Sequence, residues 1–172
     1  MRKIALTSLA ALVLSSAGLH AAEIDKNALP PSKRTSLGLY VTAADAFEQW
    51  KAKPKSIKII DVRTPEEFRL IGFPEMAMKI PLTRSPQEFV GRVKRIARPE
   101  DTLLIICRSG NRSAVAVNML AQAGFKDAYS VVDGFEGDRN ADRSSPDYGK
   151  RTVNGWKNAG LPWTKEAKSK GS

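Results

Sequence analysis

A single cysteine, Cys107, stands where a short apolar run gives way to a small basic loop. Residues 103–116 read LLIICRSGNRSAVA. The four apolar residues 103–106 are too few for a helix and are typical of a strand that is buried on both faces. Residues 108–111 favour a turn, and the apolar spacing after them predicts a helix that ends near Gly124. We therefore expect the thiol to lie in a tight loop between a strand and a helix.

Such a loop favours the thiolate form of a cysteine. A helix start directs several backbone N–H groups to one point and adds the positive end of the helix dipole. Arg108 and Arg112 add positive charge. A cysteine in these surroundings is a nucleophile, whereas a core cysteine acts as a small apolar side chain. Because Cys107 ends the apolar run and borders a polar loop, we expect the nucleophile.

The start of the chain is typical of a secretory signal peptide. Two basic residues precede the apolar stretch 4–14, which is about eleven residues long, whereas a membrane-spanning helix needs about 20. We expect cleavage near Ala21 or Ala22, so that residues 1–22 are the signal peptide. No cysteine lies at this cleavage site to carry a lipid. We therefore predict a periplasmic or secreted protein with no stable membrane anchor.

The composition of the predicted mature chain excludes several mechanisms. The only histidine of the chain, His20, falls within the predicted signal peptide. The mature chain would then lack imidazole for Ser-His-Asp or Cys-His catalysis and for zinc or copper sites that need it. One cysteine cannot form an intramolecular disulfide. An unpaired thiol in an exported protein favours a thiol that takes part in chemistry. We expect no metal and no organic cofactor.

The charge of the chain favours a small anionic substrate. The formal net charge is +10, which becomes +8 when Arg2 and Lys3 are removed with the signal peptide. A basic surface concentrates anions. Basic residues on a predicted helix and on the polar tail are equally typical of a solvated surface. Nucleic acid is not an expected partner, because the basic residues are not interleaved with aromatic ones.

The loop C-R-S-G-N-R-S, residues 107–113, resembles the active-site loop of the rhodanese family of sulfurtransferases, whose cysteine carries a transferable sulfur as a persulfide. Four residues separate Cys107 from Arg112, whereas protein tyrosine phosphatases have five at this point. The smaller ring suits a sulfur atom better than a phosphate or arsenate.

Two other segments are similar to the same family. Residues 61–68, D-V-R-T-P-E-E-F, resemble the signature D-x-R-[ST]-x-x-E-[YF]. Residues 71–81 resemble the region G-H-x-P-x-A-x-x-I-P, with Phe73 in place of the usual histidine. The resemblance covers roughly residues 41–163.

The resemblance implies sulfur transfer from a donor such as thiosulfate, through a persulfide on Cys107, to cyanide, a thiol or a protein acceptor. Arg108 and Arg112 would orient the anionic donor, with Arg108 nearer to solvent. The persulfide would be bound by backbone N–H groups of the loop residues Arg108, Ser109, Gly110, Asn111, Arg112 and Ser113.

Asp61 and Arg63 are expected near the pocket as supporting residues, with no chemical step assigned to them. We expect Arg63 to pair with Glu67 or to order the neighbouring loops.

Two alternative functions remain open. A sulfur carrier or docking module without turnover would have the same cysteine loop. A phosphatase or arsenate reductase on the same scaffold is disfavoured by the spacing of Cys107 and Arg112 and by the absence of a second cysteine.

The elements that position the loop predict an α/β fold. Residues 57–62, 103–106 and 128–132 are typical of strands. Thr64 and Pro65 predict a capped helix start, and residues 86–97 predict a helix that buries Phe89, Val93 and Ile96. Alternation of strands and helices indicates a rhodanese-like single domain with a mainly parallel central sheet flanked by helices. Sites in such sheets lie at the carboxyl ends of strands, where Cys107 falls.

We expect four segments in all. After the signal peptide comes a polar extended leader at residues 23–40. The domain follows at residues 41–164, with an inserted loop at about 138–154, and residues 165–172 form a polar tail.

Overall fold

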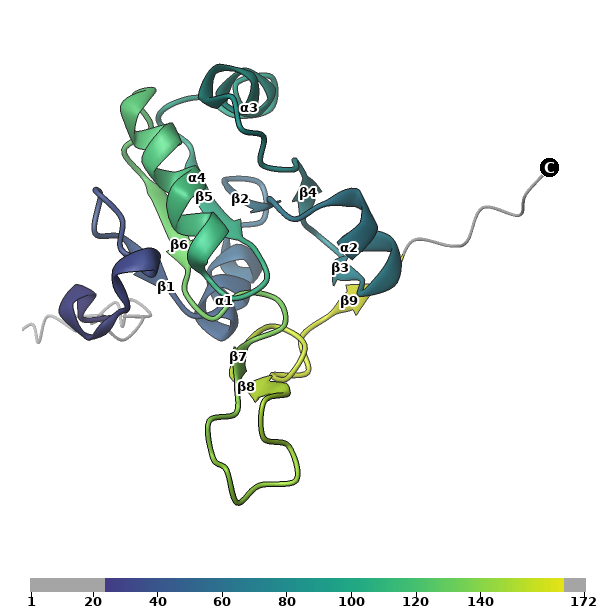
Figure 1. Ribbon diagram of the computed structural model, residues 1–172. Helices are drawn as coiled ribbons and strands as arrows, with labels where there is room; N and C mark the ends of the chain where they lie inside the picture. The colour runs from purple at the N-terminus through teal and green to yellow at the C-terminus, as the bar shows by residue number, and fades with distance from the viewer. Residues whose placement is uncertain (1–23, 166–172) are drawn as a thin grey trace, which may run out of the picture.

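The computed structural model describes residues 24–165 (Figure 1). The predicted signal peptide and most of the predicted polar tail lie outside these residues. Within residues 24–165, no helix has both the length and the apolar character needed to cross a membrane.

A five-stranded parallel sheet forms the centre of the domain, in the order β1-β6-β5-β2-β4. Its strands are β1 (Tyr40–Val41), β2 (Ile57–Asp61), β4 (Met78–Lys79), β5 (Thr102–Ile106) and β6 (Ala128–Val131). The middle strand β5 buries Leu103 and Ile105 on one face and Leu104 and Ile106 on the other. The expectation of a strand buried on both faces is confirmed.

Helices cover both faces of this sheet (Figure 1). α3 (Pro86–Val93) and α4 (Asn111–Gln122) pack on the face of Ile105, where Phe89 and Leu120 are fully buried. α1 (Ala43–Ala52) packs on the other face, together with the fully buried Trp156. The predicted α/β fold, with a mainly parallel sheet flanked by helices, is confirmed.

One predicted helix is shorter than expected. α3 ends at Val93, and a tighter turn follows, in which the N–H groups of Ile96 and Ala97 both bond to the carbonyl of Val93. This turn buries Ala97 and leaves 37% of Ile96 exposed. The prediction that Ile96 is buried was therefore wrong, because it assumed that the helical period continues to Ala97.

Two small antiparallel sheets lie beside the main sheet. β3 (Phe73–Pro74) pairs with β9 (Trp163–Thr164). β7 (Asp138–Arg139) pairs with β8 (Arg151–Val153). Residues 138–153 therefore form a hairpin, and it projects from the body of the domain (Figure 1).

The segment before β1 contains two 3-10 turns, η1 (Lys26–Ala28) and η2 (Pro31–Lys33), and η2 packs against α4. The backbone N–H of Ser36 bonds to the side chain of Asn118 on α4, at 2.7 Å. The leader therefore lies along the helix that follows Cys107.

Candidate active site

Cys107 directly follows β5, at the carboxyl edge of the sheet. Its backbone carbonyl accepts a hydrogen bond from the N–H of Phe135 at 2.8 Å, and its residue surface is 1% exposed. The cysteine lies against a pocket of about 420 Å³. The other lining residues are Thr64, Glu67, Arg108, Ser109, Asn111 and Arg112. The thiol is thus almost fully enclosed and borders this pocket.

A glycine shapes the turn between Cys107 and α4. Gly110 has φ +98°, and its N–H donates to the sulfur of Cys107 at 3.2 Å. A Cβ atom at this position would lie 2.2 Å from the carbonyl oxygen of Val132. Both the left-handed backbone and the close approach therefore require glycine.

Ser113 holds the turn from inside the protein. Its hydroxyl donates to the carbonyl of Gly110 at 2.8 Å and lies 2.9 Å from the hydroxyl of Ser130 on β6. The same hydroxyl lies 3.8 Å from the sulfur of Cys107. Because Ser113 is fully buried, its side chain positions the loop from the side opposite the solvent.

The turn after β6 supports the other side of the loop. The N–H of Glu136 bonds to the carbonyl of Arg108 at 3.0 Å. A Cβ atom on Gly134, which has φ +65°, would lie 2.6 Å from the carbonyl oxygens of Cys107 and Arg108. The backbone of Cys107 and of Arg108 is therefore packed directly against a second glycine turn.

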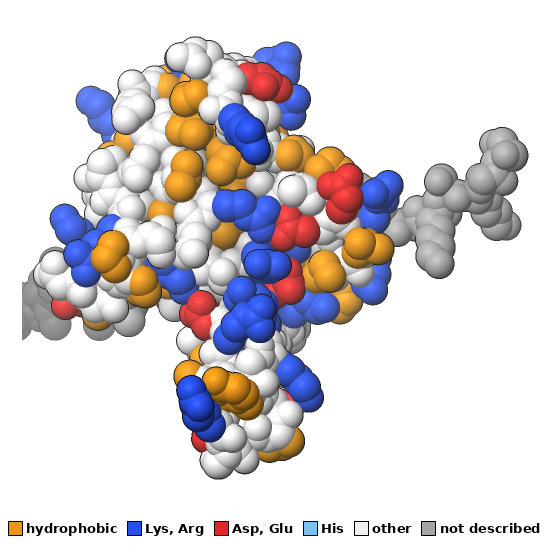
Figure 2. Space-filling model, viewed as in Figure 1, with side chains coloured by type: hydrophobic (Ala, Val, Ile, Leu, Met, Phe, Trp, Pro, Cys, Tyr) orange, Lys and Arg blue, Asp and Glu red, His pale blue; other side chains and the backbone are white. Residues whose placement is uncertain are grey.

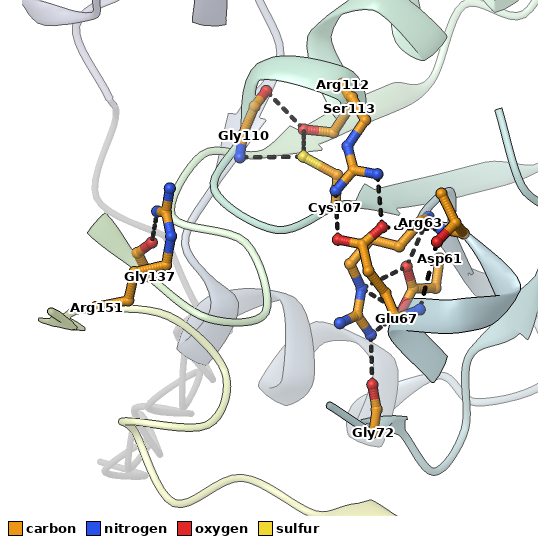
Figure 3. A network of polar contacts seen from close by, with 11 residues as sticks. Asp61, Arg63, Glu67, Gly72, Cys107, Gly110, Arg112, Ser113, Gly137 and Arg151 are labelled. Atoms are coloured by element: carbon orange, nitrogen blue, oxygen red, sulfur yellow. Dashed lines mark hydrogen bonds and ion pairs between the residues drawn. The ribbon is translucent and has the colours of Figure 1, made fainter. Parts of the chain in front are cut away.

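Arg112 is held by a carboxylate. Its two terminal nitrogens donate to the two oxygens of Glu67 at 2.7 and 2.6 Å (Figure 3). Glu67 also accepts the N–H of Thr64 at 2.9 Å, which closes a capping box at the start of α2 (Pro65–Leu70). The guanidinium is therefore fixed in orientation and largely neutralised.

The surroundings shift the pKa values of both partners. Burial alone would raise the pKa of Glu67, but hydrogen bonds from Arg112 and from the N–H of Thr64 bring it below the ordinary value. The hydrogen bonds to Glu67 raise the pKa of Arg112 against the effect of burial. Both groups are therefore charged at neutral pH.

Arg108 differs from Arg112 in exposure and in pairing. Arg108 is exposed, whereas Arg112 is half-buried. Within residues 24–165, Arg108 has no carboxylate at ion-pair distance. Its charge is thus free to act on an anion entering the pocket.

The start of α4 provides further positive potential. No side chain of the described residues caps this helix, whose N-cap is Gly110. The N–H groups of a first helical turn have no acceptor within their own helix. They are therefore available to an anion beside Cys107, where the helix dipole is also favourable.

Asp61 and Arg63 form a buried ion pair behind the pocket (Figure 3). Two nitrogens of Arg63 contact the Asp61 carboxylate at 2.6 to 3.1 Å, and one of them also donates to the carbonyl of Gly72 at 2.7 Å. The guanidinium lies 4.1 Å from the ring centre of Phe135. Burial raises the pKa of Asp61, and the charge of Arg63 opposes that shift.

The expected pairing of Arg63 with Glu67 was wrong. Arg63 precedes α2 and turns back to Asp61, while Glu67 reaches across to Arg112. The alternative expectation, that Arg63 orders the loops, agrees with its bond to the carbonyl of Gly72.

The structure thus brings together part of the predicted site. Five of the predicted residues line the pocket: Cys107, Arg108, Ser109, Asn111 and Arg112. Gly110 and Ser113 lie buried beneath it, and Asp61 and Arg63 do not line it. Sequence reasoning missed Glu67 and Thr64 as pocket residues, although both stand in the quoted signature. Gly134 was also missed, because its role depends on a contact between distant segments.

Among residues 24–165 there is no group of three or more His, Cys, Asp or Glu side chains that could hold a metal ion.

Residues 43–141 match a known protein family, described as Rhodanese-like domain. Uncharacterized protein RP600 from Rickettsia prowazekii is 32% identical over 61% of this chain and 80% of its own length. Thiosulfate sulfurtransferase 18 from Arabidopsis thaliana is 35% identical over 44% of this chain and 62% of its own length. The putative sulfur carrier protein YrkF from Bacillus subtilis is 34% identical over 52% of this chain and 45% of its own length.

A similar fold occurs in a solved structure. The crystal structure of Rv0390 from M. tuberculosis has a TM-score of 0.61 and 30% sequence identity. The match covers 72% of this chain and 95% of that protein.

Removal of the Glu67 charge tests its role in holding Arg112 and α2. We expect Glu67→Gln to lower the free energy of unfolding by about 1–3 kcal/mol at pH 7, because a charged hydrogen-bonding pair is broken. The pKa of Glu67 is lowered from 4.5. The contribution of ionised Glu67 to the free energy of unfolding is therefore complete above the ordinary pKa. This contribution is lost as the pH falls through the lower pKa of the folded state.

Urea unfolding of both proteins at a series of pH values measures this difference. The gap between them should shrink in acid, and a gap that is independent of pH would contradict the assignment. Glu88→Gln is the matched control, since Glu88 pairs with Arg92 on the surface, and its effect should stay below about 1 kcal/mol.

Removal of the Arg63 charge tests the buried pair. We expect Arg63→Gln to cost about 3–5 kcal/mol in the free energy of unfolding, because Asp61 is left buried without its cation. The control is Arg69→Gln, whose partner Glu66 is 63% exposed and whose loss should cost less than about 1 kcal/mol. Equal effects of the two substitutions in urea unfolding would refute the buried-pair account.

Proposed function

The chain belongs to the rhodanese-like domain family, and on that premise we propose that it is a sulfurtransferase that moves sulfur through a persulfide on Cys107. The observation that carries the proposal is the position of the sulfur. It borders a small pocket, accepts the Gly110 N–H at 3.2 Å, and stands beside the start of α4. A sulfur anion is favoured by such donors, as an oxyanion is in an oxyanion hole.

The proposed reaction has two steps. In the first, the Cys107 thiolate attacks the outer sulfur of a donor such as thiosulfate. A new S–S bond forms on Cys107, the S–S bond of the donor breaks, and sulfite leaves with the electron pair. In the second step an acceptor such as cyanide or a thiol attacks the outer sulfur of the persulfide. The electron pair of the broken bond returns to Cys107, which is again a thiolate.

The two arginines have different roles in this proposal. Arg108 is exposed and without an acidic partner among the described residues, so it attracts the anionic donor. Arg112 is tied to Glu67 at 2.6 and 2.7 Å, so it chiefly fixes the geometry of the helix start. This division differs from the expectation that both arginines orient the donor.

The second candidate function is that of a sulfur carrier without free turnover. The name of the Bacillus subtilis relative favours it, and a carrier would need the same cysteine loop. The two functions differ in kinetics, because a dedicated carrier loads one sulfur and releases it only to its own partner. Production of thiocyanate in large excess over protein, from thiosulfate and cyanide, would favour the enzyme.

Intact-protein mass spectrometry tests the persulfide. We expect the protein to gain the mass of one sulfur atom on treatment with thiosulfate and to lose it again with cyanide, because the activated sulfur is a nucleophile. Cys107→Ser should gain nothing. If thiosulfate and other persulfide donors leave the mass unchanged while Cys107 remains alkylatable, the proposed function is wrong.

We also propose that this reaction takes place outside the cytoplasm, on the basis of the sequence of residues 1–22. We expect N-terminal sequencing of the protein from the periplasm of an expressing bacterium to begin near Glu23. Leu12→Arg places a charge in the apolar stretch and should leave an unprocessed protein in the cytoplasm. Processing of that variant at the wild-type level would contradict the proposal.

A further inference from the structure

We propose that residues 138–153, the hairpin of β7 and β8, are a docking arm that brings a protein acceptor with an acidic surface to Cys107. The inference rests on the proposed sulfur transfer and adds the class of acceptor. The match to the family ends at residue 141, so most of the arm lies beyond the matched residues.

The arm directly follows the turn that packs against the Cys107 loop. The N–H of Glu136 bonds to the carbonyl of Arg108. The carbonyl of Gly137 accepts a hydrogen bond from a terminal nitrogen of Arg151 at 2.6 Å (Figure 3). Figure 1 shows the hairpin projecting from the end of the domain at which the loop after β5 lies. A partner held on the arm would therefore lie beside the mouth of the pocket.

The base of the arm is fixed to the domain. Asp138 forms an ion pair with Lys33 at 2.9 Å, and the Lys33 side chain is only 11% exposed. The side-chain amide of Asn158 donates to the carbonyls of Glu136 and Asn154 at 3.2 and 2.7 Å. These contacts hold the base of the arm in place against the domain.

Hydrogen bonds within the arm continue beyond the ends of β7 and β8. The N–H of Asn140 donates to the carbonyl of Lys150, and the N–H of Gly149 donates to the carbonyl of Asn140, both at 2.8 Å. The Arg139 side chain donates to the carbonyl of Gly149 at 2.6 Å. A preorganised arm loses little conformational entropy when a partner binds.

The arm carries cations without carboxylate partners. Asp138 and Asp147 are paired with Lys33 and Lys150. By contrast, the arm has three arginines that make no ion pair with any carboxylate of residues 24–165. They are Arg139, Arg143 and Arg151. The unpaired acidic groups of this surface are Glu136 and Asp142, so the arginines of the arm together with Arg108 leave an excess of positive charge.

Two of these arginines face each other. Arg139 and Arg151 are cross-strand neighbours in the hairpin, an arrangement that costs stability because like charges repel. Burial lowers the pKa of Arg151, and the nearby charges of Arg108 and Arg139 lower it further. Carboxylates of a partner would relieve this repulsion.

The exposed side chains of the arm favour a protein over a small anion. Tyr148 is 51% exposed and Val153 is 39% exposed, and the Arg143 guanidinium lies 5.8 Å from the Tyr148 ring centre. Tyrosine and arginine are common centres of protein interfaces. On the face of the molecule seen in Figure 2, Lys and Arg side chains extend from the middle of the domain down onto the hairpin.

The test measures sulfur transfer from the Cys107 persulfide to two synthetic peptides that each carry one cysteine. One peptide has a run of glutamates beside the cysteine and the other has glutamines. At low salt we expect the acidic peptide to accept sulfur about tenfold faster than the neutral one. The double variant Arg139→Gln with Arg143→Gln should lose this preference and retain its rate with cyanide.

A distant double variant controls for net charge. Lys94→Gln with Arg95→Gln removes the same charge from another exposed surface and should keep the preference for the acidic peptide. Equal rates with both peptides, or equal losses in the two double variants, would overturn the docking arm. A raised KM for thiosulfate in the arm variant, without loss of peptide preference, would instead assign the arm to a small anion and also overturn it.

Binding without chemistry separates this inference from the proposed function. Fluorescence anisotropy of the labelled acidic peptide with Cys107→Ser should report binding that weakens about tenfold in the arm variant. If that binding is present but no persulfide forms on the wild-type protein, the sulfurtransferase proposal fails while the arm stands. If persulfide forms and the peptide does not bind the arm, only the docking arm is refuted.

Discussion

The conformation of the loop from Cys107 to Gly110 is the constraint on which the rest of the site depends. The loop is enclosed by backbone on both sides, because Gly110 lies against the carbonyl of Val132 and Gly134 lies against the carbonyls of Cys107 and Arg108. Neither glycine leaves room for a side chain. The loop is therefore held by main-chain contacts from β5, α4 and the turn after β6. In this conformation the Gly110 N–H points to the sulfur. The contact to the sulfur is therefore made by the main chain and does not depend on a flexible side chain.

The charges around this loop are divided between buried or half-buried ion pairs that fix the structure and positive groups that have no acidic partner among residues 24–165. Glu67 closes the capping box of α2 and neutralises Arg112, so one carboxylate joins the helix after β2 to the helix after β5. Arg63 and Asp61 neutralise each other in the interior, where an unpaired charge would be costly. Arg108 and the uncapped start of α4 supply the remaining positive potential. The arginines of the hairpin extend that potential away from the pocket.

Local sequence patterns predicted the elements that carry the cysteine better than the contacts between them. The apolar run before Cys107, the turn after it and the Thr64-Pro65 helix start correspond to β5, the Gly110 turn and α2, because each depends on neighbouring residues. Of the two expectations for Arg63, the pairing with Glu67 was wrong and the ordering of neighbouring loops agrees with its bond to Gly72, because a local pattern does not specify which side chains meet in the fold. The role of Gly134 and the pairing of β7 with β8 depend on contacts between segments that no local pattern specifies. In the structure, the predicted insertion at about 138–154 contains the short strands β7 and β8, which pair on either side of residues 140–150.

The most direct test of the central claim is a crystal structure of the protein after treatment with thiosulfate. The account predicts one additional sulfur atom on Cys107, directed into the pocket between Glu67 and Arg108 and within hydrogen-bonding distance of N–H groups in the first turn of α4. The loop should keep its conformation, because Gly110 and Gly134 leave it no alternative position. An unmodified Cys107, or an added sulfur that points away from these N–H groups, would contradict the account.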